Sequence, residues 1–243
     1  MIYITGDTHS GYSRFSRKNF PEQKNLTKDD YMIICGDFGL WEASRETDYW
    51  LDWLEERSYT TLFVDGNHEN FDMLEELPVK QWRGGLVHEL RPHVLHLMRG
   101  QIFELEGKRF FTMGGAASHD VSDGIFDLSQ PETKNQVKWL MKQGRYHFRI
   151  LGQTWWPQEL PTEEEIAQAR SVLDACSWQV DYVITHCAPA CMVQRYEADR
   201  LTKFLDEVWD RGRFSHWYCG HYHDPLRMGK LQVLYEDIMQ LEK

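Results

Sequence analysis

Five short polar clusters carry side chains that can bind metal ions, and they are spread over most of the chain. The clusters are Asp7-Thr8-His9, Gly36-Asp37, Gly66-Asn67-His68-Glu69, Thr185-His186 and Gly220-His221-Tyr222-His223. They combine carboxylate, amide and imidazole groups. A mixed set of oxygen and nitrogen donors suits Mn, Fe, Zn or Ni, whereas an all-oxygen set suits Mg or Ca. The residue types therefore indicate a transition-metal site.

The number of candidate ligands indicates two metal ions and not one. The candidates are Asp7, His9, Asp37, Asn67, His186, His221 and His223. These are too many for one tetrahedral site, but they divide between two sites if one carboxylate bridges. Two divalent ions roughly 3.5–4 Å apart lower the pKa of a bridging water and stabilise charge on phosphoryl oxygens. Such a pair favours hydrolysis of a phosphate ester.

Each cluster also has an ordinary structural interpretation. Asp-x-His is common by chance, Gly-Asp usually marks a turn, and a histidine at a strand end is more often structural than a ligand. His-x-His after glycine fits a solvated turn. The functional interpretation depends on all five clusters occurring in order, each directly after a predicted strand.

Continuous apolar runs predict the strands that position these clusters. Ile2–Thr5, Tyr31–Cys35 and Thr61–Val64 are such runs, which are typical of strands buried on both faces. Asp7, Asp37 and Asn67 follow them at intervals of 30 residues, the size of one βαβ unit. Later strands are predicted at Arg109–Met113, Asp181–Thr185, Ser215–Cys219 and Leu231–Tyr235. Ligands of open α/β sheets bind outside the carboxyl ends of the strands, so the clusters should converge there.

The helical patterns complete one domain spanning residues 1–243, in which residues 118–161 are expected to form an insertion or lid. Helices are predicted over Arg45–Arg57 and Ala198–Asp210 and from Thr162, which forms a capping-box pattern with Glu165. Within the insertion, a helix starting near Pro131 should bury Val137, Leu140 and Met141. Trp155 and Trp156 could stack on a nucleobase, but packing as a lid over the core is the favoured interpretation.

Composition limits the partners and the compartment. The 243 residues carry 27 Lys and Arg against 38 Asp and Glu, a formal net charge of −11, which disfavours an extended nucleic acid or an anionic membrane as partner. The sequence has no run long enough to span a membrane and no evident secretory signal. Its five cysteines, an odd number, fit free thiols in a reducing cytoplasm. Oligomeric state is not indicated.

The ordered set of clusters resembles the calcineurin-like metallophosphoesterase family from residue 5 to residue 223. The resemblance implies an α/β fold in which two mixed β-sheets pack as a sandwich flanked by helices, with a dinuclear metal centre at the strand ends. It implies that Asp7, His9 and His223 hold one ion, that Asn67, His186 and His221 hold the other, and that Asp37 bridges. His68 would contact the scissile phosphate and act as general acid, and a metal-bound hydroxide would be the nucleophile. Of the candidate metals, Mn is preferred.

Departures from the Ser/Thr protein phosphatase branch narrow the resemblance. That branch has Asp and then Arg where this chain has Leu40 and Trp41, so the carboxylate that orients the catalytic histidine is missing, and Glu69 or Glu42 is a candidate replacement. A small bacterial or phage-type member is closer. Arg14 is the nearest cation for phosphate recognition, beside Asn67 and His68.

Three functions remain open at this stage. The first is hydrolysis of a small phosphomonoester or nucleotide-like substrate, and the second is a phosphodiesterase or nuclease. The third is a non-catalytic scaffold that retains the fold. The complete set of ligand positions favours an enzyme, because a scaffold has no physical need for it. Near Gly114-Gly115, His119 and Asp120 are further candidates for substrate contact or ligand support.

Overall fold

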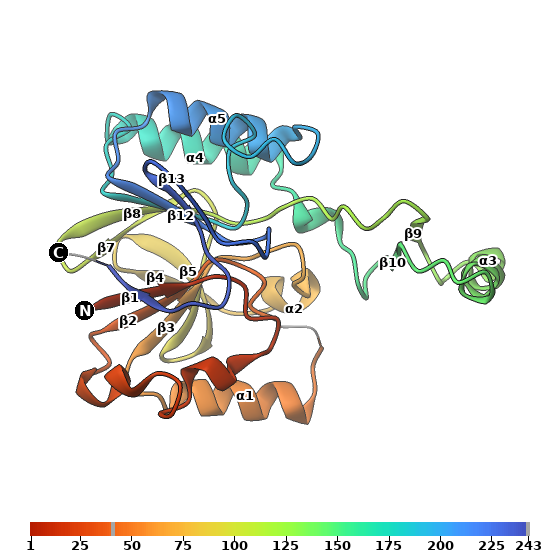
Figure 1. The fold of residues 1–243 in the computed structure, drawn as a ribbon, viewed down its shortest axis with the longest axis horizontal. Helices are drawn as coiled ribbons and strands as arrows, with labels where there is room; N and C mark the ends of the chain where they lie inside the picture. The colour runs from red at the N-terminus through yellow and green to blue at the C-terminus, as the bar shows by residue number, and fades with distance from the viewer. Residues whose placement is uncertain (40–41, 242–243) are drawn as a thin grey trace.

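The computed structural model describes residues 1–39 and 42–241 and has four layers, helix–sheet–sheet–helix (Figure 1). Within the described residues the larger sheet has the strand order β15-β1-β2-β3-β6-β5-β4, and the smaller sheet has the order β13-β14-β12-β11-β8-β7. The larger sheet consists of β1 (Ile2–Thr5), β2 (Tyr31–Ile34), β3 (Thr60–Phe63), β4 (Val79–Trp82), β5 (Gly85–Arg91), β6 (Val94–Leu97) and β15 (Met239–Gln240). The smaller sheet consists of β7 (Gln101–Leu105), β8 (Lys108–Met113), β11 (Tyr182–Thr185), β12 (His216–Cys219), β13 (Leu226–Met228) and β14 (Leu231–Val233). This arrangement confirms the predicted sandwich of two mixed sheets.

The central strands end level with one another, and this alignment matters for the site. β1, β2 and β3 are parallel, with Thr5 opposite Ile34 and Ile34 opposite Phe63. In the smaller sheet β8, β11, β12 and β14 are also parallel, while β7 and β13 add antiparallel edges. The loops that follow the parallel strands therefore emerge at one end of the molecule.

Alternate residues of the central strands enter two different cores, which explains their continuous apolar runs. Ile4 and Ile33 pack between the sheets, while Met32 and Ile34 face the outer helical layer. Every residue of β1, β2 and β3 is buried. A strand covered on both faces has no polar face to alternate with.

Helices cover the outer faces of both sheets. α1 (Arg45–Glu55), η1 (Tyr12–Phe15) and η2 (Pro21–Asn25) lie on the larger sheet, and α4 (Glu163–Ala175) and α5 (Arg200–Arg211) lie on the smaller sheet. The short α2 (Phe71–Glu75) follows the β3 loop, and η3 (Pro157–Glu159) precedes α4. The capping box of Thr162 and Glu165 is present at the start of α4, as predicted.

Part of the 118–161 segment extends away from the four layers (Figure 1). It contains α3 (Pro131–Lys142) and the parallel pair β9 (Gly124–Phe126) and β10 (Phe148–Ile150). Val137 and Leu140 are buried as predicted, but Met141 is 49% exposed, so the prediction for Met141 is wrong. Because α3 lies outside the layers, no neighbouring sheet covers the side of the helix that carries Met141.

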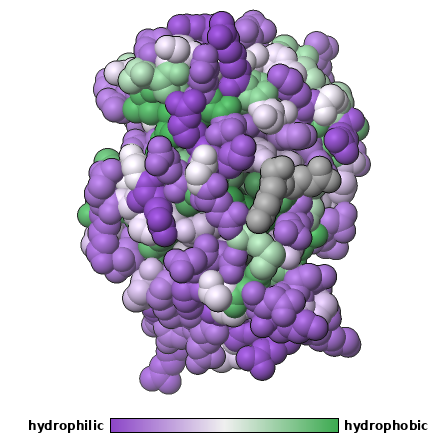
Figure 2. Space-filling model, turned by 90° about the vertical axis from the view of Figure 1, so that its left-hand side faces the viewer, coloured by the Kyte–Doolittle hydropathy of each residue, from purple (hydrophilic) through white to green (hydrophobic). Residues whose placement is uncertain are grey.

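The face at the left of Figure 1 lies opposite this segment and carries mainly hydrophilic side chains, with small hydrophobic areas (Figure 2). Among the described residues, no helix is both long and apolar enough to cross a bilayer.

Trp156 is 5% exposed and its indole Nε1 donates to Asp72 Oδ2 at 2.9 Å. This contact supports the packing interpretation for Trp156.

Candidate metal centre

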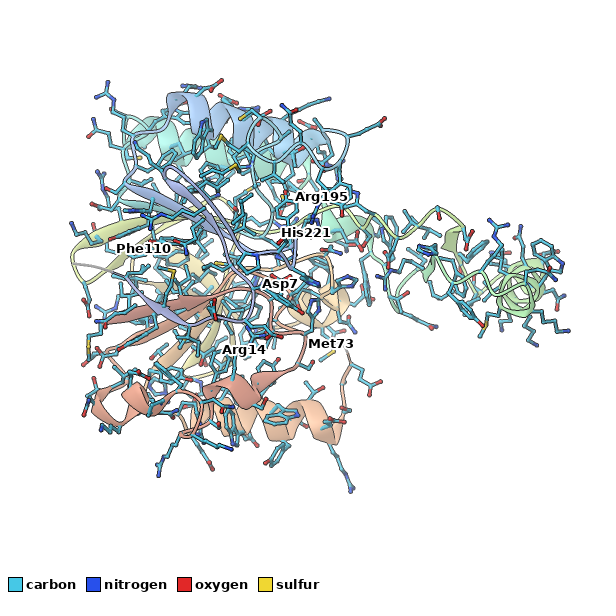
Figure 3. The ribbon with its side chains drawn as sticks, in the orientation of Figure 1. Asp7, Arg14, Met73, Phe110, Arg195 and His221 are labelled. Atoms are coloured by element: carbon cyan, nitrogen blue, oxygen red, sulfur yellow. The ribbon has the colours of Figure 1, made fainter. Side chains whose placement is uncertain are left out.

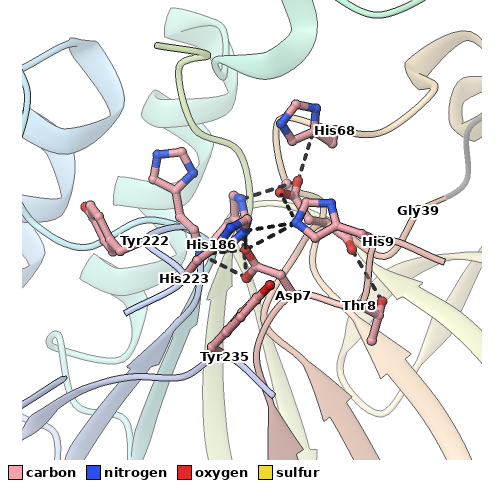
Figure 4. A network of polar contacts seen from close by, with 12 residues as sticks. Asp7, Thr8, His9, Gly39, His68, His186, Tyr222, His223 and Tyr235 are labelled. Atoms are coloured by element: carbon pink, nitrogen blue, oxygen red, sulfur yellow. Dashed lines mark hydrogen bonds and ion pairs between the residues drawn. The ribbon is translucent and has the colours of Figure 1, made fainter. Parts of the chain in front are cut away.

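The five polar clusters converge at the carboxyl ends of the parallel strands, between the two sheets (Figures 3 and 4). Asp7, Asp37 and Asn67 come from the loops after β1, β2 and β3, and His186 and His221 come from the loops after β11 and β12. Asp7, Asp37, Asn67 and His186 are buried, and His221 is half-buried. Both sheets therefore contribute donors to one place, as the strand-end positions predicted.

Four donors form a compact group: Asp7, His9, Asp37 and His223. One donor atom from each of them lies within 4.8 Å of the others. His223 Nε2 is 2.9 Å from Asp7 Oδ2 and 2.9 Å from His9 Nε2. His9 Nε2 is 3.6 Å from Asp37 Oδ2. Two carboxylates and two imidazole nitrogens that face one another form a donor set typical of transition-metal sites.

The remaining predicted ligands lie on the other side of Asp37. His186 Nε2 is 3.4 Å from Asp37 Oδ1 and 3.2 Å from Asn67 Oδ1. The His221 ring centroid lies 5.0 Å from that of His186. Asp37 thus presents one carboxylate oxygen to the His9 side and the other to the His186 side, an arrangement that is compatible with a bridging carboxylate.

A hydrogen bond to the backbone fixes the orientation of the His186 ring. Its Nδ1 lies 2.8 Å from the carbonyl oxygen of Cys35, so Nδ1 donates and Nε2 faces Asp37 and Asn67. A ligating histidine is commonly held in this way through its second nitrogen. Burial alone would lower the pKa of His186, but the carboxylates of Asp37 and Asp7 outweigh burial and raise it to about 10.

Backbone N–H groups stabilise both carboxylates. His68 N donates to Asp37 Oδ1 at 2.8 Å, and His221 N donates to Asp7 Oδ1 at 2.9 Å. Burial would raise the pKa of Asp37, but His186 and the other nearby imidazoles hold it far below its usual value. Asp37 is therefore ionised at neutral pH, as a metal ligand must be.

The backbone is strained where it carries the donors. His9, Asp37, His221 and His223 have φ angles of 44°, 45°, 70° and 51°, in the left-handed region that non-glycine residues rarely occupy. Such conformations cost about 1–3 kcal/mol each and concentrate at functional sites. The local sequence alone would not select these turns, so the surrounding structure must stabilise them.

Two glycines of the clusters are required by close approach. A Cβ at Gly66 would lie 2.1 Å from Asp37 Oδ1, and a Cβ at Gly220 would lie 1.9 Å from Asp7 Oδ1. Each of these glycines therefore leaves space for a carboxylate from a neighbouring loop.

His68 and Arg14, which were predicted to bind substrate, differ in their contacts. The His68 ring is half-buried, with its centroid 5.6 Å from that of His9, and burial lowers its pKa. The Arg14 guanidinium donates to the carbonyl oxygens of Asp7 and Tyr235, each at 2.8 Å. Arg14 thus fixes the backbone of a candidate ligand, and its contact with substrate stays a prediction.

The candidate replacements for the missing carboxylate also have defined places. Glu69 is buried, and its carboxylate accepts hydrogen bonds from the backbone N–H groups of Phe38 and Gly39. It stabilises the loop that carries Asp37. Glu42 is exposed, and Leu40 and Trp41 lie outside the described residues.

Three residues near the centre were not predicted as site residues: Ser118, Glu159 and Arg149. Ser118 accepts a hydrogen bond from Asn67 Nδ2 at 3.1 Å and donates from its hydroxyl to Glu159 at 2.9 Å. Arg149 Nε donates to Asp120 at 3.0 Å, and its charge contributes to lowering the pKa of His68. The Gly114-Gly115 sequence gave a signal for Ser118, but no local pattern identifies Glu159 or Arg149.

The residues present fit a bound metal ion. Buried carboxylates lie opposite imidazole nitrogens, and each carboxylate also accepts a hydrogen bond from a backbone N–H group. Uncompensated buried carboxylates are costly, so a cation between Asp7 and Asp37 would relieve their repulsion. The cluster confirms the expectation of a metal-binding site.

Comparison with known proteins agrees with this geometry. Residues 1–225 match the calcineurin-like phosphoesterase family. The chain therefore belongs to this family, which confirms the resemblance inferred from the clusters and, at the level of the family, the expectation of a phosphoesterase enzyme.

Two curated relatives are lariat debranching enzymes. Lariat debranching enzyme A of Xenopus laevis is 25% identical over 167 residues, which cover 62% of this chain and 29% of the relative. The lariat debranching enzyme of Danio rerio is 24% identical over 172 residues, which cover 62% of this chain and 27% of the relative. The chain thus aligns with less than a third of the length of these relatives.

Proposed function

We propose that the protein hydrolyses phosphate esters with a dinuclear metal centre at the carboxyl ends of the strands. The observation that carries the proposal is the placement of Asp37, which lies between the Asp7–His9–His223 group and the Asn67–His186 pair. Membership of the calcineurin-like phosphoesterase family supports it.

The residues have distinct proposed roles around that centre. Asp7, His9 and His223 would hold one ion, Asn67, His186 and His221 the other, and Asp37 would bridge. Bound divalent ions would lower the pKa of a water and neutralise phosphoryl charge, with Mn preferred to Fe, Zn or Ni. His68 is half-buried beside His9 and would donate a proton to the leaving-group oxygen.

A small phosphomonoester or nucleotide-like molecule is the proposed substrate. His9 borders two cavities of about 840 Å³ and 310 Å³. Arg14 and Tyr235 line the first, and Trp50 lines the second. Spaces of this size admit a small organic phosphate. The net charge of −11 opposes a long polyanion.

A phosphodiester substrate is the second candidate, because the two relatives are lariat debranching enzymes. A non-catalytic scaffold is the third candidate. The complete donor set opposes a scaffold, since a scaffold has no physical need for every donor position to be filled.

The domain organisation and the cellular compartment of the protein are also proposals. We propose one domain over residues 1–243 with 118–161 inserted in it, because elements on both sides of this segment belong to the same layers. A lid function for the segment stays a prediction. All five cysteines lie in the described chain and are free thiols, which supports a reducing cytoplasm.

The test is hydrolysis of p-nitrophenyl phosphate and of bis(p-nitrophenyl) phosphate with Mn, Ni, Zn or Mg. We expect a metal-dependent rate, higher with the monoester. Asp37→Asn should abolish hydrolysis, and His68→Ala should lower kcat about 10²–10⁴-fold. The exposed His147 gives a matched control, His147→Ala, with an unchanged rate.

Other outcomes would decide between the candidates. A faster reaction with the bis-ester would favour the phosphodiesterase. Purified protein that binds no transition metal and hydrolyses neither compound in Mn would favour the scaffold. An unchanged rate in Asp37→Asn would contradict the bridging role.

A further inference from the structure

The two ends of the inserted segment meet beside a candidate metal ligand. Ser118 stands at the start of the segment and Glu159 near its end, 41 residues apart. The Ser118 backbone N–H donates to Glu159 Oε2 at 3.0 Å, and the Ser118 hydroxyl donates to Glu159 Oε1 at 2.9 Å. Asn67 Nδ2 donates to Ser118 Oγ at 3.1 Å. A chain of hydrogen bonds thus runs from Glu159 through Ser118 to Asn67.

The direction of this chain follows from the chemistry of its first member. When Glu159 is ionised, its carboxylate can only accept hydrogen bonds, so the Ser118 hydroxyl donates its hydrogen bond to Glu159. The lone pairs that remain on Ser118 Oγ can only accept, and the group facing them is the Asn67 amide. The amide must therefore turn its NH₂ toward Ser118 and its oxygen the other way.

That orientation decides what Asn67 offers to a cation. Asn67 Oδ1 lies 3.2 Å from His186 Nε2, on the side where the second ion is proposed. A carboxamide oxygen can bind a metal ion, whereas the NH₂ group has no lone pair available for one. A flipped amide would remove a ligand and place two N–H donors against the ion.

The hydrogen bonds from Glu159 through Ser118 to Asn67 connect buried groups. Asn67 is 4% exposed and Glu159 is 2% exposed, so water competes little for either group. Burial raises the pKa of Glu159 to about 8, against the two hydrogen bonds from Ser118 and the charge of Arg149. A divalent cation bound beside Asn67 would favour the ionised carboxylate further.

We propose that Ser118 and Glu159 are positioning residues that hold the Asn67 amide with its oxygen toward the second metal ion. This inference rests on the proposed function. It also assigns a role to the inserted segment, because the segment brings Glu159 back to Ser118 and so completes the chain of hydrogen bonds.

The first experiment measures Mn²⁺ binding to the purified apo-protein by calorimetry at pH 8.5, where Glu159 is mostly ionised. Ser118→Ala should weaken Mn²⁺ binding at one of the two proposed sites about 10–100-fold, the usual effect of removing a group that orients a ligand. Glu159→Gln should weaken binding by a similar factor. The NH₂ of the glutamine can donate to Ser118 Oγ, and the Ser118 hydroxyl is then free to donate to the Asn67 oxygen. Ser118→Thr keeps the hydroxyl and should keep the affinity.

Matched controls come from exposed positions on α4. Ser171→Ala and Glu163→Gln should leave both Mn²⁺ affinities unchanged. Far-UV circular dichroism and the melting temperature of each apo-protein show whether a variant is folded.

The second experiment separates orientation of the amide from general support of the loop. In an Asn67→Asp background both terminal atoms are oxygens, so turning the group by 180° no longer changes the ligand. The loss caused by Ser118→Ala should then largely disappear. A merely structural role for Ser118 would give the same loss in both backgrounds.

The results distinguish this inference from the proposed function. Wild-type protein that binds two Mn²⁺ ions and hydrolyses phosphate esters, together with folded Ser118→Ala of unchanged affinity, would overturn the inference alone. An equal loss in the Asn67→Asp background would also overturn it. Wild-type protein that binds no metal would overturn the proposed function and this inference with it.

Discussion

The donor residues occupy backbone conformations that only their neighbours make accessible. Asp37 has a φ of 45°, and its carboxylate lies against the Cα of Gly66, where a Cβ would be 2.1 Å from Oδ1. Its carboxylate also contacts the N–H of His68 and the imidazole of His186. The position of one carboxylate therefore depends on three loops from two sheets.

Gly66→Ala should displace Asp37 and weaken Mn²⁺ binding at least about 10-fold, because overpacking forces neighbouring groups to move. Calorimetry of the purified variant measures this effect. Gly107→Ala is the control. Gly107 has a φ of +74° and no atom within 4 Å of an added Cβ, so this variant should lose about 1–2 kcal/mol of stability and keep its metal affinity. Unchanged affinity in Gly66→Ala would contradict the close packing of Asp37.

His88 gives a prediction about acid sensitivity. It is 8% exposed, and its Nδ1 lies 2.9 Å from Nδ1 of His96. Burial, with help from His96, lowers the pKa of His88 to about 4 from 6.5. Between these two pH values the unfolded chain binds a proton that the folded chain does not. Stability from this group is therefore complete above pH 6.5 and falls as the pH drops toward 4.

The total loss attributable to His88 is about 3 kcal/mol at most. His88→Gln should remove that part of the pH dependence of the free energy of unfolding, measured with urea between pH 7 and pH 4.5. His147→Gln, at an exposed position, should keep the wild-type dependence. Identical pH profiles for His88→Gln and wild type would contradict the assignment.

At the scale of elements, α4 and α5 illustrate how local chemistry fixes a helix start. Thr162 caps α4, and Asp199 caps α5, each with a reciprocal contact from the third helical residue. Ile166, Ala169 and Leu173 then pack on the smaller sheet. The caps define where each helix begins, and the buried stripe defines which face it turns inward.

Thr162→Ala should lower the free energy of unfolding by about 1 kcal/mol, because it leaves helix N–H groups without a partner. Urea denaturation measures the change. Thr162→Ser keeps the hydroxyl and should stay within about 0.5 kcal/mol of wild type. Metal affinity should be the same in both variants. An equal loss in the two would show that packing of the threonine methyl group matters more than its capping bond.

At the scale of the whole molecule, the inserted segment has two parts. The two ends of the segment meet at Ser118 and Glu159, and Ser118 is hydrogen-bonded to Asn67 of the candidate metal centre. Its outer part, with α3, extends away from the four layers. Among the described residues, β9 and β10 form a two-stranded sheet of their own. The strands of the two large sheets therefore do not need β9 or β10 as hydrogen-bonding partners.

Replacing residues 128–146 by a short Gly-Ser linker should leave the melting temperature within a few degrees of wild type and both Mn²⁺ affinities unchanged. Because β9 and β10 are parallel, the linker has to run back along these short strands, from the end of β9 to the start of β10. Hydrolysis of p-nitrophenyl phosphate should persist. Loss of metal binding in a folded deletion variant would show that the outer part supports the centre directly.

Much of the fold was predictable, because it follows from local patterns. The runs at β1, β2 and β3 indicated strands buried on both faces, and the capping box marked the start of α4. The strands β4, β5, β6 and β7 were not predicted, because these short strands include polar or exposed residues such as those of β4. Met141 was placed on a buried face because its spacing fits, but α3 has no sheet beneath that face.

The amino-acid sequence by itself determined which donors exist, the strands that precede them and the family to which the chain belongs, since residue type and local periodicity carry that information. The tertiary structure decided how those donors face one another. Asp37 lies between two groups of donors, four donors have left-handed backbone conformations, and hydrogen bonds link Glu159 through Ser118 to Asn67. These features depend on contacts between residues far apart in the chain, and only folding brings such residues together.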